Sequence, residues 1–146
     1  MKLTDVLALQ LKKNKIEYEQ FLHLKNFFSP KKSAGLLLRG DLFKEGHISI
    51  QDPAGGLVVS LLNPQKGETI IDGCSAPGGK TAFIAELMKN EGKIIAFDIS
   101  KERLGRLLTG MKRLSIDIVD AEIKDLRTDG LPKSYKIILD VPCSGT

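Results

Sequence analysis

Short apolar runs alternate with segments of helical periodicity along the second half of the chain. Four of these runs predict strands, at residues 69–72, 93–98, 117–123 and 135–140. Residues 81–89 and 100–114, which lie between strands, carry apolar side chains at helical spacing. Strands that are apolar along their length and separated by helices are typical of a parallel sheet covered on both faces. The pattern therefore predicts an α/β fold.

The first half of the chain has a different pattern. Residues 1–30 predict two short amphipathic helices, the second with Tyr18, Phe21 and Phe28 on or near one face and Pro30 at its end. The elements expected next are a strand or loop at 36–39, another at 47–50, and a buried helix at 57–62 that follows the start signal Asp52-Pro53. We expect a small helical segment in front of the sheet.

Composition and charge are those of an ordinary folded domain. The 146 residues are 42% hydrophobic and 27% charged, which excludes a disordered or fibrous chain, and two cysteines exclude a disulfide scaffold. The sequence contains no secretory pattern and no apolar run of the roughly 20 residues that span a bilayer. We therefore expect a cytoplasmic protein with no membrane partner. The net charge of +4 permits a polyanionic partner, and the sequence leaves the oligomeric state open.

The end of the chain predicts that this is a fragment of a longer protein. Only six residues follow Asp140, the end of the fourth expected strand. A sheet that stopped there would expose the apolar residues 137–139 at its edge, and such edges are usually covered because they invite pairing with other chains. The expected sheet is thus truncated after its fourth strand.

A glycine-rich segment, residues 72–81, joins the first expected strand of the sheet to a helix. In an open parallel sheet, ligands bind at the carboxyl ends of the strands, where such loops lie. Small residues let a ligand approach the backbone, and the helix N-terminus offers free N–H groups to an anion. The alternative is a glycine-rich turn that binds nothing. A phosphate-binding loop needs four residues between its first glycine and a Gly-Lys pair, but five separate Gly73 from Gly79-Lys80. Thr81 nevertheless fits that motif, so a nucleoside triphosphatase is kept as the rival hypothesis.

Two aspartates favour a nucleoside ligand. Asp98 ends the second strand of the sheet, about 20 residues after the loop, where a carboxylate accepts hydrogen bonds from ribose hydroxyls. Its alternative role is to cap the next helix, which Ser100 would do equally well. Asp125 follows the third strand at the level of a bound base, and its alternative role is plain surface charge.

Two motifs together resemble the Nol/Nop/Sun family of RNA cytosine-5 methyltransferases, and within it the bacterial Sun/Fmu (RsmB-like) ribosomal RNA branch. They are Asp72-Gly73-Cys74-Ser75-Ala76-Pro77-Gly78-Gly79-Lys80-Thr81 and Asp140-Val141-Pro142-Cys143-Ser144-Gly145-Thr146. Residues 46–52 also resemble the family's lead into its catalytic domain. The resemblance covers 46–146, the expected N-terminal part of the methyltransferase domain, and only loosely 1–45, which would help to seat RNA. Gly73 and Ser75 stand where leucine and alanine are common in the family.

The resemblance implies a Rossmann-like class I methyltransferase fold that binds S-adenosyl-L-methionine. It implies that Asp98 holds the ribose and Asp125 contacts the adenine. The other cofactor-binding residues that it implies are Cys74, Ser75, Ala76, Pro77, Gly78, Gly79, Lys80 and Asp140. It implies RNA as the partner, ribosomal RNA ahead of transfer RNA, and no DNA. A non-enzymatic RNA-binding fragment is a further alternative.

The candidate catalytic residues are Asp140 and Cys143. Methylation at carbon 5 of cytosine requires a cysteine thiolate to add to carbon 6 first, and an acidic group near N3 stabilises the developing charge. In the family that the chain resembles, the nucleophile lies in a later Thr-Cys motif and the Pro-Cys cysteine assists product release. Only Cys74 and Cys143 are present, so the roles left open for Cys143 are nucleophile, product release and a small buried apolar residue. We expect the chain alone to be inactive.

Basic residues concentrate in the N-terminal third and are candidates for phosphate contacts, at Lys12, Lys13, Lys15, Lys31, Lys32 and Arg39. A solvated surface is the alternative explanation for such charges. His23 and His47 have no partners at metal-ligand spacing, so we expect no metal site.

Overall fold

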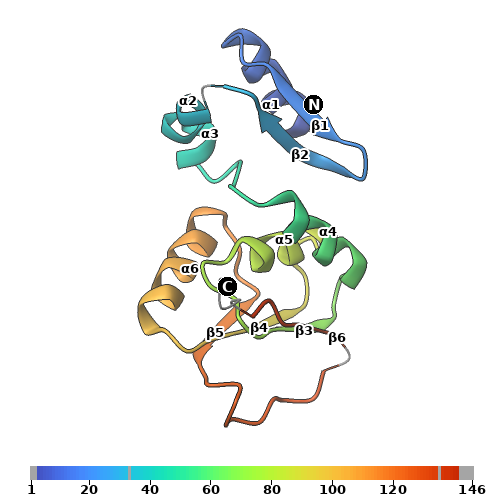
Figure 1. Ribbon diagram of the computed structural model, residues 1–146, viewed down its shortest axis with the longest axis vertical. Helices are drawn as coiled ribbons and strands as arrows, with labels where there is room; N and C mark the ends of the chain where they lie inside the picture. Colours follow the sequence, from blue (N-terminus) through green and yellow to red (C-terminus); the bar gives the residue numbers. More distant parts are fainter. Residues whose placement is uncertain (1–2, 33, 135, 142–146) are drawn as a thin grey trace, which may run out of the picture.

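The computed structural model describes residues 3–32, 34–134 and 136–141, which form two parts (Figure 1). The first part, here called the N-terminal module, contains α1 (Leu3–Lys13), β1 (Tyr18–Phe21), β2 (Leu24–Pro30), α2 (Ala34–Arg39) and α3 (Asp41–Lys44). The second, the α/β part, contains α4 (Pro53–Leu62), β3 (Thr69–Asp72), α5 (Gly79–Leu87), β4 (Lys93–Asp98), α6 (Lys101–Arg113), β5 (Val119–Ile123) and β6 (Lys136–Ile138).

The α/β part is built on a four-stranded sheet in the order β5-β4-β3-β6. All three pairings are parallel, and β3 lies between β4 and β6. The chain therefore moves outward from β3 through β4 to β5 and then crosses back to add β6 on the other side. The predicted α/β fold is confirmed, and each strand lies within the range expected from the sequence.

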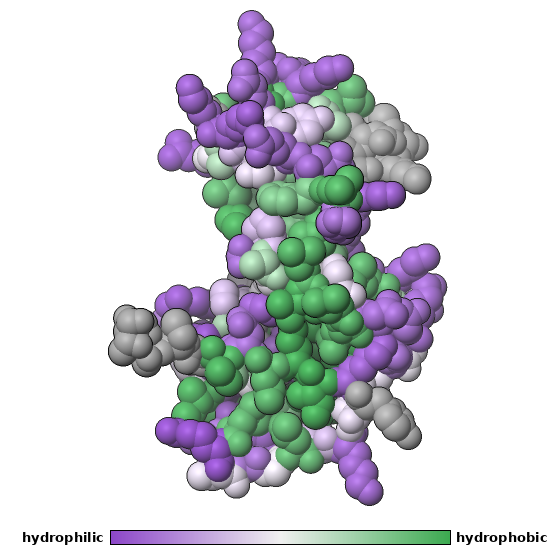
Figure 2. All heavy atoms as spheres, turned by 45° about the vertical axis from the view of Figure 1, so that its right-hand side comes forward, coloured by the Kyte–Doolittle hydropathy of each residue, from purple (hydrophilic) through white to green (hydrophobic). Residues whose placement is uncertain are grey.

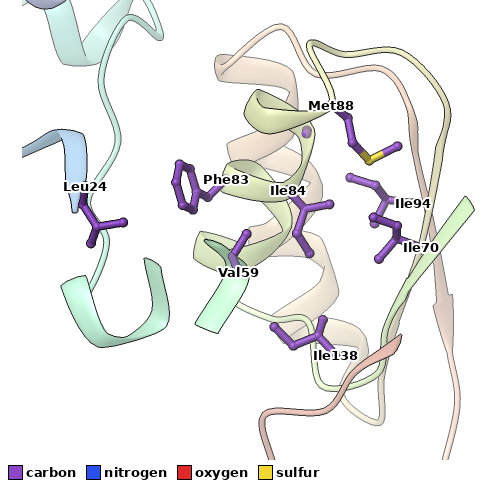
Figure 3. Packing of buried hydrophobic residues seen from close by; sticks show 9 residues of the cluster. Leu24, Val59, Ile70, Phe83, Ile84, Met88, Ile94 and Ile138 are labelled. Atoms are coloured by element: carbon purple, nitrogen blue, oxygen red, sulfur yellow. The ribbon is translucent and has the colours of Figure 1, made fainter. Parts of the chain in front are cut away.

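Helices α4, α5 and α6 pack on one face of the sheet. Ile70, Ile94 and Ile138 from three strands meet Val59 of α4 and Ile84 of α5 in one apolar cluster (Figure 3). A second cluster joins α6 to the same face, through Ala82, Ala96, Leu104, Leu107 and Met111. The five residues named from the first cluster are at most 5% exposed, so this layer forms the core of the α/β part.

The expectation that helices cover both faces of the sheet is wrong for the described residues. Residues 124–134, which connect β5 to β6, contain no helix in the structure. On that face the ring of Phe97 is buried beneath the Lys124 ammonium, 4.6 Å from its centroid, while Ile137 is 40% exposed. Charged residues, glycine and proline dominate the connection, and they do not supply the apolar stripe that a covering helix needs.

The N-terminal module differs from the helical segment that the sequence predicts. Tyr18–Phe21 and Leu24–Pro30 form an antiparallel hairpin with an irregularity between Gln20 and Phe21, where a helix was expected. Tyr18 and Phe28 pack edge to face across it, 5.4 Å apart, and such aromatic pairs stabilise strands. Residues 36–39 lie in α2, where a strand or loop was expected. Residues 47–50 form no regular element, as the loop alternative allowed.

Helix α4 begins the α/β part and is less buried than predicted. The Asp52 carboxylate caps it by accepting hydrogen bonds from the N–H groups of Ala54 and Gly55, as the Asp-Pro signal predicts. Its outer residue Leu61 is 86% exposed. Figure 2 shows that apolar side chains gather over part of the surface in the lower half of the molecule. None of the helices among the described residues is long and apolar enough to cross a membrane.

Candidate functional site

Four aspartates gather where the parallel strands end. Asp72 and Asp98 are the last residues of β3 and β4, Asp125 follows β5 by two residues, and Asp140 follows β6 by two residues. Because adjacent parallel strands present their carboxyl ends at one edge of the sheet, these side chains border a common region. The glycine loop, residues 73–78, lies at the same edge between β3 and α5. The structure thus groups most of the predicted site residues there.

The glycine loop is tied to its neighbours by hydrogen bonds. Both the backbone N–H and the hydroxyl of Ser75 donate to the carbonyl of Phe97 in β4, at 2.9 and 3.0 Å. The carbonyl of Ala76 accepts a 2.6 Å hydrogen bond from the Arg103 guanidinium on α6. Gly78 has φ +107°, and a Cβ there would lie 3.1 Å from Leu107. These bonds and contacts hold the loop in place, with Pro77 at its exposed tip.

Asp72 is a buried carboxyl group, and one of its oxygens accepts no hydrogen bond from the described residues. Its side chain is 1% exposed, and its Oδ2 accepts a 2.7 Å hydrogen bond from the Thr81 hydroxyl. Oδ1 has no partner among the described residues. Burial raises the pKa of Asp72 to about 6, although the Thr81 hydrogen bond and nearby Lys80 oppose that shift. A free acceptor beside the loop is suited to a ligand donor such as an ammonium group.

Asp98 is also buried, at 4% exposure, and each of its carboxylate oxygens has a partner. The N–H of Ser100 donates to Oδ1 at 3.0 Å, and the Arg103 guanidinium lies 3.4 Å from Oδ2. The helix cap is a separate residue, because the hydroxyl of Ser100 accepts the N–H of Arg103. The N-cap of α6 is therefore Ser100 and not Asp98.

Lys80 and Asp140 form an ion pair across the mouth of the site, between Nζ and Oδ2. The lysine side chain is 25% exposed, and the aspartate side chain 58%. The Lys80 stem crosses α4 at Gly55, where an added Cβ would lie 3.3 Å from Cε. Gly55 therefore makes room for the lysine to reach the end of β6.

The surroundings of Asp125 lower the pKa of its carboxyl group, whereas those of Cys74 raise the pKa of its thiol. Asp125 binds the guanidinium of Arg127 through both oxygens, at 2.7 and 3.0 Å, and these hydrogen bonds lower its pKa to about 2. Asp125 is therefore paired with a basic residue of its own loop. Cys74 is half-buried in the loop, and burial together with Asp98 and Asp72 raises its thiol pKa. A thiol in this setting is a poor nucleophile at neutral pH.

The predicted catalytic Cys143 lies outside the described residues. Within those residues, no cluster of three histidine, cysteine, aspartate or glutamate side chains has the geometry of a metal site. Sequence reasoning did not select Asp72, Thr81 or Arg103 as site residues. The place of Asp72 at the end of an apolar strand was a usable signal, whereas nothing in the sequence pairs Arg103 with the loop.

The strand order, the glycine loop and the strand-end aspartates define a Rossmann-like methyltransferase fold. The sequence model of the family described as "16S rRNA methyltransferase RsmB/F" matches residues 59–146, and the chain belongs to this family. The resemblance noted from the two motifs is thus confirmed.

Two curated relatives and one crystal structure illustrate the similarity. The chain is 40% identical over 118 residues to the probable ribosomal RNA small subunit methyltransferase B of Bacillus subtilis, covering 75% of this chain and 26% of that protein. It is 40% identical over 111 residues to a 28S rRNA (cytosine-C(5))-methyltransferase of Mus musculus, covering 72% and 24%. NSun6 from Pyrococcus horikoshii, crystallised with SFG, an S-adenosylmethionine analogue, superposes with a TM-score of 0.67 at 38% identity, covering 73% and 28%. The chain spans about a quarter of the length of these relatives.

Proposed function

We propose that this chain is part of an S-adenosyl-L-methionine-dependent methyltransferase that acts on carbon 5 of cytosine in RNA, with ribosomal RNA as the substrate. The observation that carries the proposal is the glycine loop bordered by four strand-end aspartates in a member of the RsmB/F family. The names of the relatives support ribosomal RNA and cytosine carbon 5, and the analogue in the related crystal structure supports the cofactor.

The residues at the loop fit such a cofactor. Asp72 offers a buried acceptor without a partner, which suits the ammonium group of an amino acid. Asp98 lies at the position of a ribose-binding carboxylate. A Cβ added to Gly79 would meet only the Ile50 carbonyl, 3.9 Å away, so the backbone at the start of α5 is approachable. The residues proposed to hold the cofactor are Cys74, Ser75, Ala76, Pro77, Gly78, Gly79, Lys80, Asp98, Asp125 and Asp140, and we add Asp72. When bound, S-adenosylmethionine supplies an electrophilic methyl group.

Lys80 and Asp140 are proposed to stabilise the negative charge that develops at N3 of the cytosine ring. Carbon 5 is a weak nucleophile until a thiolate adds to carbon 6, and that addition places negative charge on the ring at N3. The Lys80 ammonium pairs with Oδ2 of Asp140, so it holds this carboxyl group at the mouth of the site and provides a nearby proton. A proton passed through Asp140 to N3 would stabilise the adduct.

The N-terminal module is proposed to bind RNA phosphates. All six basic candidates are exposed, and one of them, Lys31, is paired with Glu19 at 3.2 Å; the other five are Lys12, Lys13, Lys15, Lys32 and Arg39. Each phosphate contact releases a counterion, so the affinity for RNA is expected to fall steeply as the salt concentration rises. An affinity that does not change with salt would show that these lysines are solvated surface only.

The test is calorimetric titration of the 146-residue chain with S-adenosylhomocysteine, and separately with ATP and magnesium. We expect S-adenosylhomocysteine to bind and Asp98→Ala to weaken it by at least about tenfold, the loss of one charged hydrogen-bonded group. Asp120→Ala is the matched control, because Asp120 pairs with Lys93 on the exposed face of the same sheet and should leave the affinity unchanged.

Two other outcomes would overturn the proposal. Binding of ATP with magnesium but not of S-adenosylhomocysteine would favour the phosphate-loop enzyme, and RNA binding without either ligand would favour a non-enzymatic RNA-binding protein. Incubation with labelled S-adenosylmethionine and ribosomal RNA addresses Cys143. Transfer by this chain would assign that cysteine as the nucleophile, and no transfer is the expected result.

A further inference from the structure

Arg103 links three elements at the edge of the proposed nucleoside site. It belongs to α6, and its Nη2 atom donates to the Ala76 carbonyl in the glycine loop at 2.6 Å. The same nitrogen lies 3.4 Å from Oδ2 of Asp98 at the end of β4. One guanidinium nitrogen with two hydrogens therefore contacts both the loop and the buried carboxylate.

The position of Arg103 is itself fixed at its backbone. Its N–H donates to the Ser100 hydroxyl at the start of α6, and the N–H of Ser100 donates to Oδ1 of Asp98. The first turn of α6 thus holds Asp98 from both sides, through a backbone N–H at one oxygen and the guanidinium at the other. A carboxylate held at both oxygens has little rotational freedom.

Because Asp98 is buried, its negative charge needs a cation close by. The Asp98 side chain is 3% exposed, and a buried carboxylate without a cation beside it is costly. Arg103 provides that cation while its own side chain remains 44% exposed. Arginine is suited to the task because its planar group presents N–H donors in fixed directions, which an ammonium group does not.

We propose that Arg103 is a positioning residue for the nucleoside site, which orients the Asp98 carboxylate toward the ligand's hydroxyl groups and fixes the adjoining loop through the Ala76 carbonyl. This inference rests on the proposed function, since it takes the ligand to be a nucleoside. Arg103 acts through Asp98 and not by its own contact with the ligand. The two residues should therefore be coupled energetically in ligand binding.

The experiment is a double-mutant cycle in S-adenosylhomocysteine affinity, measured by calorimetry with Arg103→Ala, Asp98→Asn and the double variant. We expect Arg103→Ala to weaken binding about tenfold in the wild-type background, the effect of one charged contact. In the Asp98→Asn background the same change should cost less than about threefold, because the negative charge that Arg103 pairs with is gone and only its hydrogen bond to the Ala76 carbonyl remains. Arg103→Lys should recover part of the loss, and Arg103→Gln should recover none.

Arg106→Ala is the matched control. Arg106 lies on the same helix, pairs only with Glu102 among the described residues, and should leave the affinity unchanged. Equal losses from Arg103→Ala in both backgrounds would overturn the inference, as would wild-type affinity in Arg103→Ala. If Arg103→Ala lowers the melting temperature below the titration temperature, the comparison of Arg103→Lys with Arg103→Gln decides in its place. Absence of binding by the wild-type chain would instead contradict the proposed function.

Discussion

Asp72 shows how the burial of a single carboxyl group lowers stability at neutral pH. Its carboxyl group is almost fully buried and lacks a partner for one oxygen among the described residues. The pKa rises from an ordinary value of 3.8 to about 6 because burial penalises the charged form. The folded protein consequently holds the proton more tightly than the unfolded chain between these two values. Stability therefore falls as the pH rises from about 4 to about 6, and stays lower above that range.

The variant Asp72→Asn tests this account. It removes the charge and keeps an acceptor for the Thr81 hydroxyl, so its stability relative to wild type should increase between pH 4 and pH 8. The expected change in the difference is at most about 3 kcal/mol, which corresponds to a pKa shift of about two units. Urea unfolding at both pH values measures it. The exposed Asp117→Asn should show no such change, and a pH-independent difference for Asp72→Asn would contradict the assignment.

At the scale of elements, Gly46 shows how tightly the connection between the two parts is held. Arg113, at the end of α6, donates to the carbonyls of Phe43 and Ile48, and its guanidinium lies 4.0 Å from the centre of the Phe43 ring. Gly46 has φ +81°, and a Cβ there would lie 1.8 Å from the Arg113 carbonyl oxygen. Only glycine fits this approach.

Gly46→Ala is expected to lower the free energy of unfolding by about 3 kcal/mol, since strain and collision combine. Gly67→Ala is a close control, because Gly67 has φ +78° but nothing within 4 Å of the added Cβ. It should cost only about 1 kcal/mol, the penalty of the left-handed backbone alone. Thermal or urea unfolding compares the two variants. Equal losses of unfolding free energy in the two variants would show that the backbone around Gly46 shifts to accommodate the added methyl group.

The elements of the α/β part could be predicted because their apolar periodicity is local. β3, β4 and the helix capped by Ser100 follow from the pattern of a few neighbouring residues. The hairpin of the N-terminal module could not, because the aromatic spacing at Tyr18, Phe21 and Phe28 fits a helix as well as two strands. The choice depends on pairing between β1 and β2 and on packing against α4, which are contacts between distant residues.

The candidate site also contains features that the local sequence predicts and features that depend on contacts between distant elements. The glycine loop and Asp98 were selected from their positions at the ends of strands, which the sequence displays directly. The Arg103 contacts with Ala76 and Asp98 span 27 and 5 residues and depend on where α6 packs. The Lys80–Asp140 pair spans 60 residues and depends on β6 lying next to β3. Sequence reasoning selected both of these residues without predicting that they meet.

For the whole molecule, the main question is how the N-terminal module is attached to the α/β part. Leu24 of β2 belongs to the same apolar cluster as Val59 and Phe83 (Figure 3). Phe27 packs edge to face on Phe83 with ring centres 5.0 Å apart. A Cβ at Gly56 would lie 2.6 Å from the Phe27 ring, so α4 approaches β2 closely only because it carries glycine there. The attachment at β2 therefore includes a small apolar contact, beside the hydrogen bond from Asn26 to Glu86 and the Arg113 contacts with Phe43.

Phe27→Ala should loosen this attachment while the sheet of the α/β part stays folded. The change removes the contacts with Phe83 and with α4 at Gly56, and we expect it to lower stability by about 2 kcal/mol, less than for a fully buried phenylalanine. Amide exchange should accelerate in β1, β2 and residues 45–52, and proteolysis should cut that connection faster. Exchange in β3 and β4 should change little.

Phe28→Ala separates attachment from the folding of the module itself. Phe28 lies next to Phe27 in β2 but packs on Tyr18 within the hairpin, so its removal should accelerate exchange in β1 and β2 without faster cleavage at residues 45–52. If the two variants gave the same cleavage pattern, the Phe27–Phe83 contact would not be what holds the module. If Phe27→Ala also accelerated exchange in β3 and β4, the two parts would unfold as one cooperative unit. The RNA binding proposed for the module would then be coupled to the stability of the glycine loop.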